Sequence, residues 1–538
     1  MIQFDPNFQP YPSNRYCVTA RNGMVASGSN LATAAGLEVL RKGGNAVDAA
    51  VATAAALTVV EPTANGLGSD SFALVWIKDK LYGLNSSGYS PKNITLEKVL
   101  EKYPDGKMPT HGWTPVMVPG AVKSWPTLVK RFGKLSLAED LAPAIRYASE
   151  GFPLSPMLSQ MWERSTQIFH KRFDGQPEFA EWFRVFTNNG ESYHFGDIVR
   201  LPDHAKTLKL IAETDADAFY KGEIAKQLVK QSERDGGYFS LEDLSSYESE
   251  WVEPIKVNYR GYDVYEIPPN GQGIVALMAL NILKEFDFTN NENTDTYHKQ
   301  LEAIKIAFAD AKYYVTDPKD MKVTAAQLLD PAYGAMRAKE ITDTAGMPLH
   351  SDPAKSGTVY LCTADGEGNM VSYIQSNYMG FGSGIVVEGY GVSLQNRGAD
   401  FSLNPEDANA LKPHKKSYHT IIPGLLAQGN KPIGPFGVMG GYMQPQGHVQ
   451  VVMNMVDFHM NPQMALDAPR WQWYEGKRVE VEPHFNNAIV QALARKGHQI
   501  SIANNGLPFG RGQIIVRLDN GVLVGGCESR TDSNIACY

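Results

Sequence analysis

The stretch KSGTVYLCTADGEGNMVSYIQS, from Lys355 to Ser376, contains two apolar runs of strand-forming residues separated by DGEGN. Asp, Gly and Asn are residues that turns favour, so the pattern predicts a β-hairpin. Its first strand begins at Thr358, directly after Gly357 and after a polar stretch, 342–357, without helical or strand period. Such a stretch is typical of an exposed loop. The hairpin therefore starts directly after a loop in which the peptide chain could be cleaved.

Strand and helix patterns lie on both sides of this hairpin. Four later segments are rich in β-branched and apolar residues and are predicted as strands: 448–456, 478–483, 513–519 and 521–526. Two earlier segments, 71–85 and 257–267, are also predicted as strands. Apolar residues recur at helical spacing in five earlier segments: 30–44, 141–151, 223–233, 273–286 and 298–315. The segment 45–62 is rich in Ala and apolar all round apart from Asp48, which predicts a helix buried between other layers. Helices packed outside sheets of this kind predict a layered α+β domain.

The composition narrows the class of function. The 538 residues are 43% hydrophobic and 20% charged, which suits a large globular core. The net charge is −8 and no run of Lys or Arg occurs, so we expect a small-molecule substrate and neither a nucleic-acid nor a membrane partner. The longest apolar run, 46–60, is too short to span a bilayer, and the N-terminus lacks a signal-peptide pattern.

Cysteine and histidine usage adds to these expectations. The cysteines are too few for a disulfide framework and form no CxxC pair: Cys17, Cys362, Cys527 and Cys537. Free thiols indicate a reducing compartment, and we expect a cytoplasmic protein. The 12 histidines show no HExxH or other metal spacing, so no metal is expected. No complete dinucleotide or phosphate-loop motif occurs either, and no cofactor is expected.

Thr358 is the first candidate for chemistry. A Thr beside a Gly at a strand start is usually structural, because Thr favours strands. If the preceding loop were cut after Gly357, however, Thr358 would become a new N-terminus. Its free α-amine, with an ordinary pKa of about 7.7–8.0, could then act as the base that activates its own hydroxyl.

Two further segments have both a structural and a functional interpretation. Gly440 and Gly441, in GVMGGYMQPQG, fit a tight turn, but could also present two N–H groups to an oxyanion. Arg397 and Asp400, in LQNRGADFS, fit a surface ion pair. They could equally bind a zwitterion, with the carboxylate holding an amine and the guanidinium holding a carboxylate. Spacing alone does not decide between these interpretations.

Taken in order along the chain, several motifs resemble those of the gamma-glutamyltranspeptidase family, also called glutathione hydrolases. The resemblance runs from about residue 22 to the C-terminus. The motifs are AAGLEVLRKGGNAVDAAVATAAALTVVEP, FYKGEIA with GGYFSLEDLSSYE, EAIKIAFADAKYYVTDP, GTVYLCTADGEGN, ADFSLNP, GVMGG and MALDAPRW.

This resemblance implies an N-terminal nucleophile hydrolase with a four-layer αββα sandwich. It implies a precursor that cuts itself between Gly357 and Thr358, giving a large chain, 1–357, and a small chain, 358–538, that form one interleaved fold. A dimer of such heterodimers is possible. The family residues carry over in order: Thr358 is the nucleophile, Ser376 stands for a second Thr that supports it, Gly440 and Gly441 form the oxyanion hole, and Asp400 holds the substrate α-amino group.

The chain departs from the family pattern around the substrate. Ser87 stands where members have an arginine for the substrate α-carboxylate. His419 and Thr420 replace a Ser-Ser pair, Arg397 replaces a Gln, and Tyr378 replaces an Asn. The segment between Phe401 and Lys412 is shorter than in members with a lid loop, so a more open pocket is expected.

The function predicted from these residues is the hydrolysis, and possibly the transfer, of gamma-glutamyl amides such as glutathione. One alternative is an oxamate amidohydrolase or a cephalosporin-acylase-like hydrolase of a small carboxylate amide. An alternative of another class is a protein that binds amino-acid-like ligands without turnover. The substrate-binding residues predicted for any of these functions are Asp400, Arg397, His419, Thr420 and Tyr378.

Overall fold

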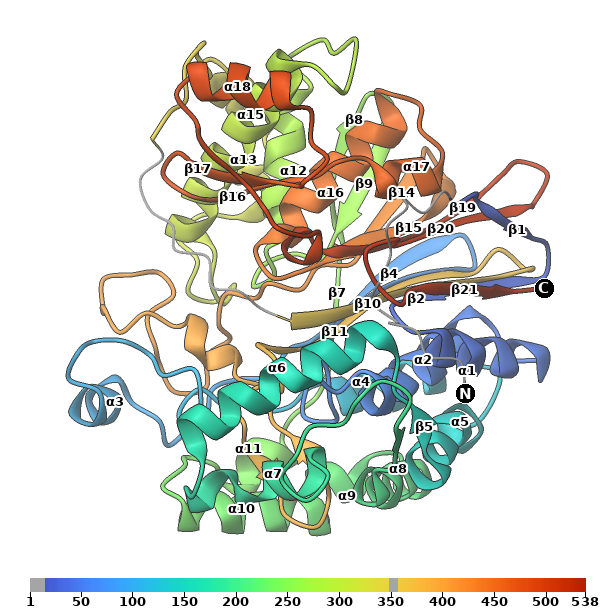
Figure 1. Ribbon diagram of the computed structural model, residues 1–538, viewed down its shortest axis with the longest axis vertical. Coiled ribbons are helices and arrows are strands. Elements are labelled where there is room, and N and C mark those ends of the chain that lie inside the picture. Colours follow the sequence, from blue (N-terminus) through green and yellow to red (C-terminus); the bar gives the residue numbers. More distant parts are fainter. Residues whose placement is uncertain (1–14, 348–356) are drawn as a thin grey trace.

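Two antiparallel sheets of seven strands each form the centre of the molecule (Figure 1). The computed structural model describes residues 15–347 and 357–538. In spatial order, the first sheet consists of β1 (Val18–Ala20), β20 (Leu523–Cys527), β19 (Arg511–Arg517), β15 (Lys431–Met439), β14 (Gly424–Gln428), β9 (Tyr262–Glu266) and β8 (Ile255–Tyr259). The second consists of β21 (Asn534–Cys537), β2 (Gly23–Ser27), β10 (Gly357–Asp365), β11 (Met370–Tyr378), β3 (Asp70–Ile77), β4 (Lys80–Ser86) and β7 (Glu250–Val252).

An apolar layer between the sheets holds them together. Along β10, Tyr360 and Cys362 pack into this layer, whereas Val359 and Leu361 pack into the core on the opposite face. Successive side chains of a strand point to opposite faces, so Thr358 shares the side of Tyr360. The side chain of Thr358 therefore points into the space between the two sheets, where it is fully buried.

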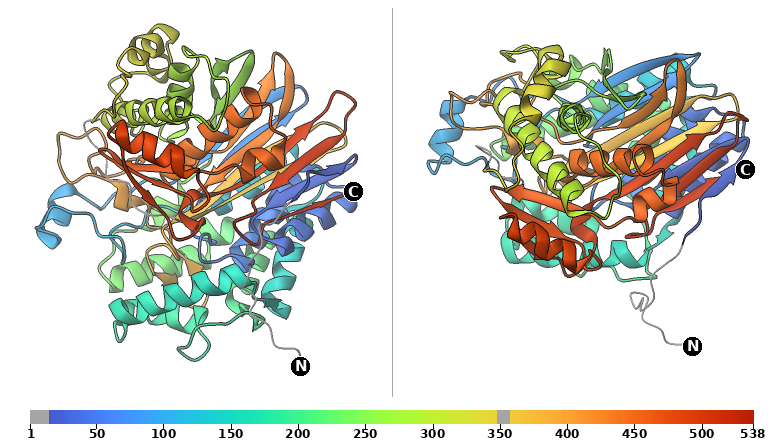
Figure 2. Two further views of the ribbon diagram at one scale, coloured as in Figure 1. Left: turned by 45° about the horizontal axis from the view of Figure 1, so that its top comes forward. Right: turned by 90° about the horizontal axis from the view of Figure 1, so that it is seen from above.

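Helices cover both outer faces and complete four layers (Figures 1 and 2). The second sheet is covered by α1 (Asn30–Arg41), α2 (Ala46–Val60) and α4 (Ala121–Phe132), and α5 (Leu137–Glu150) packs on α2. The first sheet is covered by α12 (Gly273–Leu283), α16 (Met443–Val456) and α17 (Pro462–Asp467), and α13 (Thr294–Tyr314) packs on α12. The predicted αββα sandwich is thus confirmed. No helix among residues 15–347 and 357–538 is long and apolar enough to cross a membrane.

The remaining elements surround this sandwich. The helices are α3 (Leu96–Lys102), α6 (Pro156–Phe173), α7 (Ala180–Phe186), α8 (Pro202–Thr214), α9 (Asp217–Tyr220), α10 (Glu223–Arg234), α11 (Leu241–Ser245), α14 (Ala325–Leu328), α15 (Pro331–Ala338) and α18 (Asn487–Arg495), with short 3-10 turns at Pro177–Phe179, Arg397–Asp400 and Leu507–Phe509. The strands are β5 (Phe152–Pro153), β6 (Ile198–Val199), β12 (Val386–Val387), β13 (Val392–Ser393), β16 (Trp471–Glu475), β17 (Arg478–Val481) and β18 (Gln499–Ile502).

One predicted strand is wrong. The segment 448–456 belongs to helix α16, although its β-branched residues and irregular apolar spacing suggested a strand. Almost every residue of α16 is buried, so the helix has no polar face to produce a helical period. In the predicted loop 342–357, residues 342–347 have no helix or strand. Its residues 348–356 lie outside the described part of the chain.

Gly437 tests how tightly the two sheets are packed. A Cβ built on this β15 residue would lie 2.5 Å from the Tyr360 ring on β10. We expect Gly437→Ala to reduce the free energy of unfolding by about 1–3 kcal/mol, because the ring has to move within a packed core. Urea denaturation measures the change, with Gln428→Ala, an exposed position on β14, as the control. Equal stability of Gly437→Ala and the wild type would contradict this packing.

Candidate functional site

Thr358 and Ser376 face each other on the adjacent strands β10 and β11. Gly357 pairs with Tyr378 and Val359 pairs with Gln375, so two residues of β11 lie opposite the single residue Thr358. This irregularity is a β-bulge, a feature that re-aims side chains near functional sites. It brings the Ser376 Oγ to 3.0 Å from the Thr358 Oγ1, and both side chains are buried.

Tyr378 connects this hydroxyl pair to Asp400. Its backbone N–H donates to the Ser376 Oγ at 2.8 Å, and its φ of 77° lies in a region that non-glycine residues seldom adopt. Its phenol donates to the Asp400 Oδ1 at 2.8 Å. The Tyr442 phenol donates to the same oxygen at 3.0 Å. Asp400 is therefore held in place by two tyrosines, one of which also holds Ser376.

Arg397 lies beside Asp400 because one short 3-10 turn carries both residues. Its guanidinium stacks 4.0 Å from the centroid of the Tyr378 ring, and its Nη1 donates to the Thr420 Oγ1 at 2.7 Å. The same Nη1 is 3.6 Å from the Asp400 Oδ2. Neither the Arg397 Nη2 nor the Asp400 Oδ2 has a hydrogen-bond partner among the described residues, although both atoms are buried. A bound ligand with one acceptor and one donor could satisfy both atoms.

Gly440 and Gly441 form the turn between β15 and α16. Their φ angles of 133° and 61° belong to the region that favours glycine. The Gln272 side chain donates to the carbonyl oxygens of both Gly441 and Thr420, at 2.8 and 2.6 Å. This bridge places the glycine pair next to the Thr420 that binds Arg397. Two consecutive backbone N–H groups in such a turn are suited to an oxyanion.

His419 is fully buried and has its ring nitrogens directed at protein atoms. Its Nε2 lies 3.0 Å from the Asp70 Oδ2, and its Nδ1 accepts from the Ile421 N–H at 3.4 Å. The Asp70 Oδ1 accepts from the N–H groups of Gly88 and Gly120. Burial raises the pKa of Asp70 to about 7 and lowers that of His419 well below its usual range. His419 is thus neutral, and Asp70 itself lies beside Ser376 in the sheet.

The predicted site residues therefore form one connected cluster in space. A family model described as gamma-glutamyltranspeptidase matches residues 32–538. The chain belongs to this family. A solved structure described as a cephalosporin acylase from Bacillus halodurans is 54% identical, with a TM-score of 0.97, covering 100% of this chain and 99% of that one.

Two curated relatives of this gamma-glutamyltranspeptidase family member carry different names. A glutathione hydrolase-like YwrD proenzyme from Bacillus subtilis is 38% identical over 95% of this chain and 97% of the relative. An oxamate amidohydrolase proenzyme from Klebsiella pneumoniae is 31% identical over 96% of this chain and 98% of the relative. The names agree on precursors of hydrolases and differ in substrate, so the specific substrate follows from the site and not from the family.

Sequence reasoning missed several residues of the cluster. Asp70, Tyr442 and Gln272 connect the predicted residues to one another through the contacts above. Tyr442 directly follows the glycine pair, which is the one sequence signal that could have identified it. Ser87, which stands in the place of the family arginine, bonds to Asn85 at 2.8 Å and lies 3.4 Å from the Asn270 Oδ1. A buried group of small amides and hydroxyls thus fills that position in this gamma-glutamyltranspeptidase family member.

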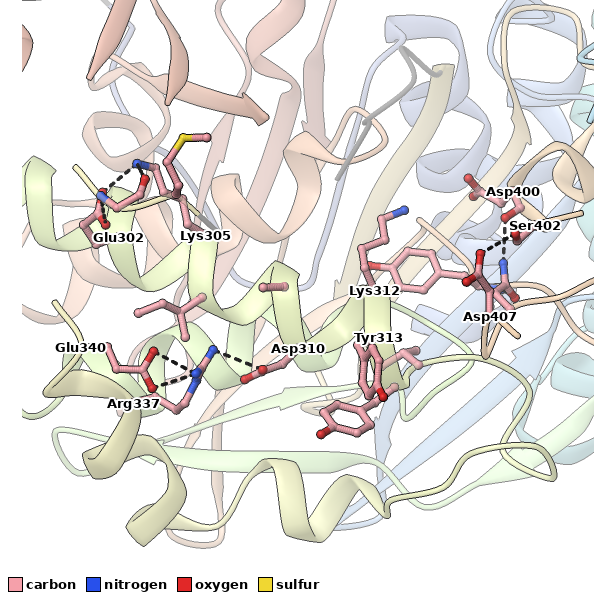
Figure 3. Close-up of a pocket in the computed structure, with 18 residues that line it drawn as sticks. Glu302, Lys305, Asp310, Lys312, Tyr313, Arg337, Glu340, Asp400, Ser402 and Asp407 are labelled. Atoms are coloured by element: carbon pink, nitrogen blue, oxygen red, sulfur yellow. Dashed lines mark hydrogen bonds and ion pairs between the residues drawn. The ribbon is translucent and has the colours of Figure 1, made fainter. Parts of the chain in front are cut away.

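A cavity of about 1180 Å³ reaches Asp400 from the surface. Figure 3 shows Asp400, Ser402 and Asp407 at one end, Glu302 and Lys305 at the other, and Lys312 in between. Lys312 stacks on the rings of Tyr418 and Tyr442 and bonds to the Tyr442 phenol. Apolar and aromatic side chains make up much of the walls, among charged side chains of both signs, so the cavity suits a charged or zwitterionic small molecule with an apolar part.

The raised pKa of Asp70 predicts a pH effect on stability. Unfolded Asp has a pKa of about 3.9, so between about pH 4 and pH 7 the folded chain holds a proton on Asp70 that the unfolded chain has lost. In this protonated form the Asp70 Oδ2 donates to the His419 Nε2, and the imidazole proton lies on Nδ1 at the cost of the long contact with the Ile421 N–H. The stability contributed by Asp70 therefore falls as the pH rises through this window. Asp70→Asn cannot titrate. We therefore expect its free energy of unfolding, relative to that of the wild type, to rise by more than about 1 kcal/mol between pH 4 and pH 7.

Urea denaturation at several pH values measures this difference. Asp519→Asn, at an exposed aspartate before β20, controls for the loss of one carboxylate. A wild-type-minus-Asp70→Asn difference that stayed constant from pH 4 to pH 7 would show that Asp70 titrates as an ordinary aspartate.

Proposed function

We propose that the protein is a self-processing amidohydrolase whose nucleophile is Thr358. The observation that carries this proposal is the buried Thr358–Ser376 hydroxyl pair at the first residues of β10, next to Asp400 and Arg397. Cutting the Gly357–Thr358 bond would give the chains 1–357 and 358–538. Both chains contribute strands to both sheets, which supports their staying together as one fold.

In the proposed reaction, the Thr358 Oγ1 attacks the carbonyl carbon of an amide. The free α-amine of Thr358 takes the hydroxyl proton, directly or through a water molecule, and passes it to the leaving amine. The C–N bond breaks and an ester forms between the acyl group and Thr358. A water molecule, deprotonated by the same amine, then hydrolyses this ester and releases the carboxylic acid.

The neighbours of Thr358 have supporting roles in this proposal. Ser376 accepts the Tyr378 N–H and can donate its own proton to the Thr358 Oγ1, which would stabilise the oxygen as it loses its proton. The N–H groups of Gly440 and Gly441 would bind the oxyanion of the tetrahedral intermediate, an interaction worth roughly 3–4 kcal/mol per donor in other hydrolases.

The unsatisfied atoms of Arg397 and Asp400 support a zwitterionic acyl group as the substrate. An α-ammonium would bind the Asp400 Oδ2, and an α-carboxylate would bind the Arg397 Nη2. A gamma-glutamyl amide has both groups on one carbon atom. Arg397 is the better carboxylate receptor than His419, because both ring nitrogens of His419 already have protein partners. In this proposal Tyr378, Thr420 and His419 position Arg397, Asp400 and Asp70.

Ser87 favours a second candidate, the hydrolysis of an amide of a short carboxylic acid without an α-amine. Because Ser87 stands in the place of the family arginine, the Arg397 guanidinium is the one proposed to face the acyl group. A single guanidinium could bind an acyl group that carries one carboxylate and no α-amine. The names of the cephalosporin acylase and the oxamate amidohydrolase support this candidate.

We favour hydrolysis over transfer, because the segment between Phe401 and Lys412 is short and a pocket without a lid admits water. The four unpaired cysteines support a cytoplasmic location.

Thr358→Ala tests the nucleophile. We expect the wild type to give two fragments on a denaturing gel that sum to 59.2 kDa, with Thr358 as the N-terminus of the smaller one. Thr358→Ala should stay uncut and inactive, because it has no hydroxyl to attack. Thr358→Ser, which keeps the hydroxyl, is the matched control and should be cut. A persistent single wild-type chain would favour the binding protein that does not turn over its ligand.

Arg397→Gln tests the carboxylate receptor. Loss of a charge-assisted hydrogen bond, worth roughly 1.5–3 kcal/mol, should lower kcat/KM about 10- to 100-fold for carboxylate-bearing substrates. The panel contains glutathione, a gamma-glutamyl anilide, a glutaryl amide and oxamate, each with and without glycylglycine. Asp400→Asn should impair only the gamma-glutamyl compounds, because only they carry the α-amine. Equal loss on all four substrates in Asp400→Asn would argue against an ammonium at Asp400.

A further inference from the structure

Four buried polar side chains form a cluster at the end of the cavity that lies away from Asp400, and Figure 3 shows the two that line the cavity, Glu302 and Lys305. His298, Glu302 and Lys305 come from α13, and His498 comes from the turn between α18 and β18. None is more than 4% exposed. Such a group of charges and imidazoles is costly to bury unless each polar atom has a partner.

The distances assign a proton to each contact in this cluster. The His298 Nε2 lies 2.7 Å from the Thr342 carbonyl oxygen, which can only accept, so this nitrogen carries the proton. In a neutral ring, the His298 Nδ1 then accepts from the His498 Nε2, at 2.8 Å. The His498 Nδ1 in turn faces the Lys305 Nζ at 3.5 Å, and the Lys305 Nζ donates to the Glu302 Oε1 at 2.7 Å. Both imidazoles are neutral, in agreement with burial, which lowers their pKa values.

The outer atoms of the cluster hold the segment 342–347. The Glu302 Oε2 accepts from the Gly346 N–H at 2.9 Å, and the Lys305 Nζ lies 3.3 Å from the Gly346 carbonyl oxygen. The Ala345 N–H donates to the Lys496 carbonyl oxygen at 2.7 Å, and Ala345 is 5% exposed although its neighbours on the N-terminal side are exposed. A segment without helix or strand is thus fixed at Thr342, Ala345 and Gly346.

We infer that His298, Glu302, Lys305 and His498 form an anchor for the C-terminal arm of the large chain. The segment 342–347 is the last described part of the chain before Gly357. Three anchor residues precede the proposed cut, whereas His498, together with Lys496, follows it. The anchor therefore joins the two proposed chains at the arm that leads to the cut. That the anchor joins two separate chains rests on the proposed function. The contacts of the anchor do not involve Gly357 or Thr358, so they are the same whether or not the chain is cut.

The same cluster has the composition of a metal site, and Lys305 argues against that use. Potential ligand atoms of His298, Glu302 and His498 lie within 4.8 Å of one another. The Lys305 ammonium already neutralises Glu302 and faces the ring of His498. A divalent cation here would be repelled by a buried ammonium a few ångströms away. Lys305 is the cation of this site.

Hydrogen exchange measured by mass spectrometry tests the anchor. In the wild type and in uncut Thr358→Ala, peptides covering 342–347 should be protected. Glu302→Gln should raise their exchange at least about tenfold, because an amide has only one oxygen and cannot accept from both the Lys305 ammonium and the Gly346 N–H. Ala345→Pro, which removes one donor and leaves no buried charge unpaired, should have the same effect if Glu302→Gln does not fold. Glu340→Gln, a half-exposed acid on the same cavity wall, is the control and should exchange like the wild type.

The outcomes separate this inference from the proposed cut. Protection that is lost in Glu302→Gln and Ala345→Pro, together with a wild type that stays uncut on a gel, would refute the cut and keep the anchor. Wild-type exchange rates in both variants would overturn the anchor even in a chain that is cut. Stoichiometric zinc in native mass spectra, with zinc increasing the protection of 342–347, would also overturn it in favour of a metal site. Because a freed arm only lengthens a loop, self-cutting in either variant should slow about threefold at most.

Discussion

The pairing of β10 with β11 is the interaction on which the candidate site depends. The register of these two strands fixes which residues of β11 lie opposite Thr358, and the bulge at Ser376 brings the two hydroxyls into contact. Both strands are central in their sheet, between β2 and β3, so neither can shift without breaking the pairing on its other side. A slip of one residue would turn Thr358 away from the space between the sheets.

Placing this hydroxyl pair between two sheets requires partners for many buried polar groups. Tyr378 donates hydrogen bonds to both Ser376 and Asp400. Gln272 donates to the carbonyl oxygens of Thr420 and Gly441. Asp70 is the hydrogen-bond partner of His419. Each partner thereby also fixes the position of a candidate functional group. Among the predicted substrate-binding residues, the atoms without a partner in the described structure are the second guanidinium nitrogen of Arg397 and the second carboxylate oxygen of Asp400. Buried atoms without partners are costly, and a bound ligand is one way to satisfy them.

The layers of the fold could be predicted because local sequence signals agree with them. The hairpin at Thr358 and the helices α1, α2, α12 and α13 all show the period or turn residues of their final structure. Helix α16 could not be predicted in this way. Helices α2 and α12 are also buried on all sides, but they are rich in Ala and Leu, which favour helices, whereas the segment 448–456 is rich in Val, which favours strands.

The site was predictable in part, for a different reason. Thr358, Ser376 and the glycine pair lie in motifs that resemble a family, so their proximity was expected from the resemblance. Asp70 and Gln272 were missed, because their role depends on contacts with residues far away in the sequence. The anchor was missed for the same reason: His498 is separated from α13 by much of the chain, and no spacing rule connects them.

Trapping the acyl group on the protein tests the central claim most directly. The wild type is mixed with a gamma-glutamyl anilide, quenched in acid within one turnover, and its small chain is digested and analysed by mass spectrometry. We predict a mass increase equal to the gamma-glutamyl group on the peptide that begins at Thr358. An acyl group on any other residue, or anilide release with no acylated peptide at any quench time, would contradict Thr358 as the nucleophile.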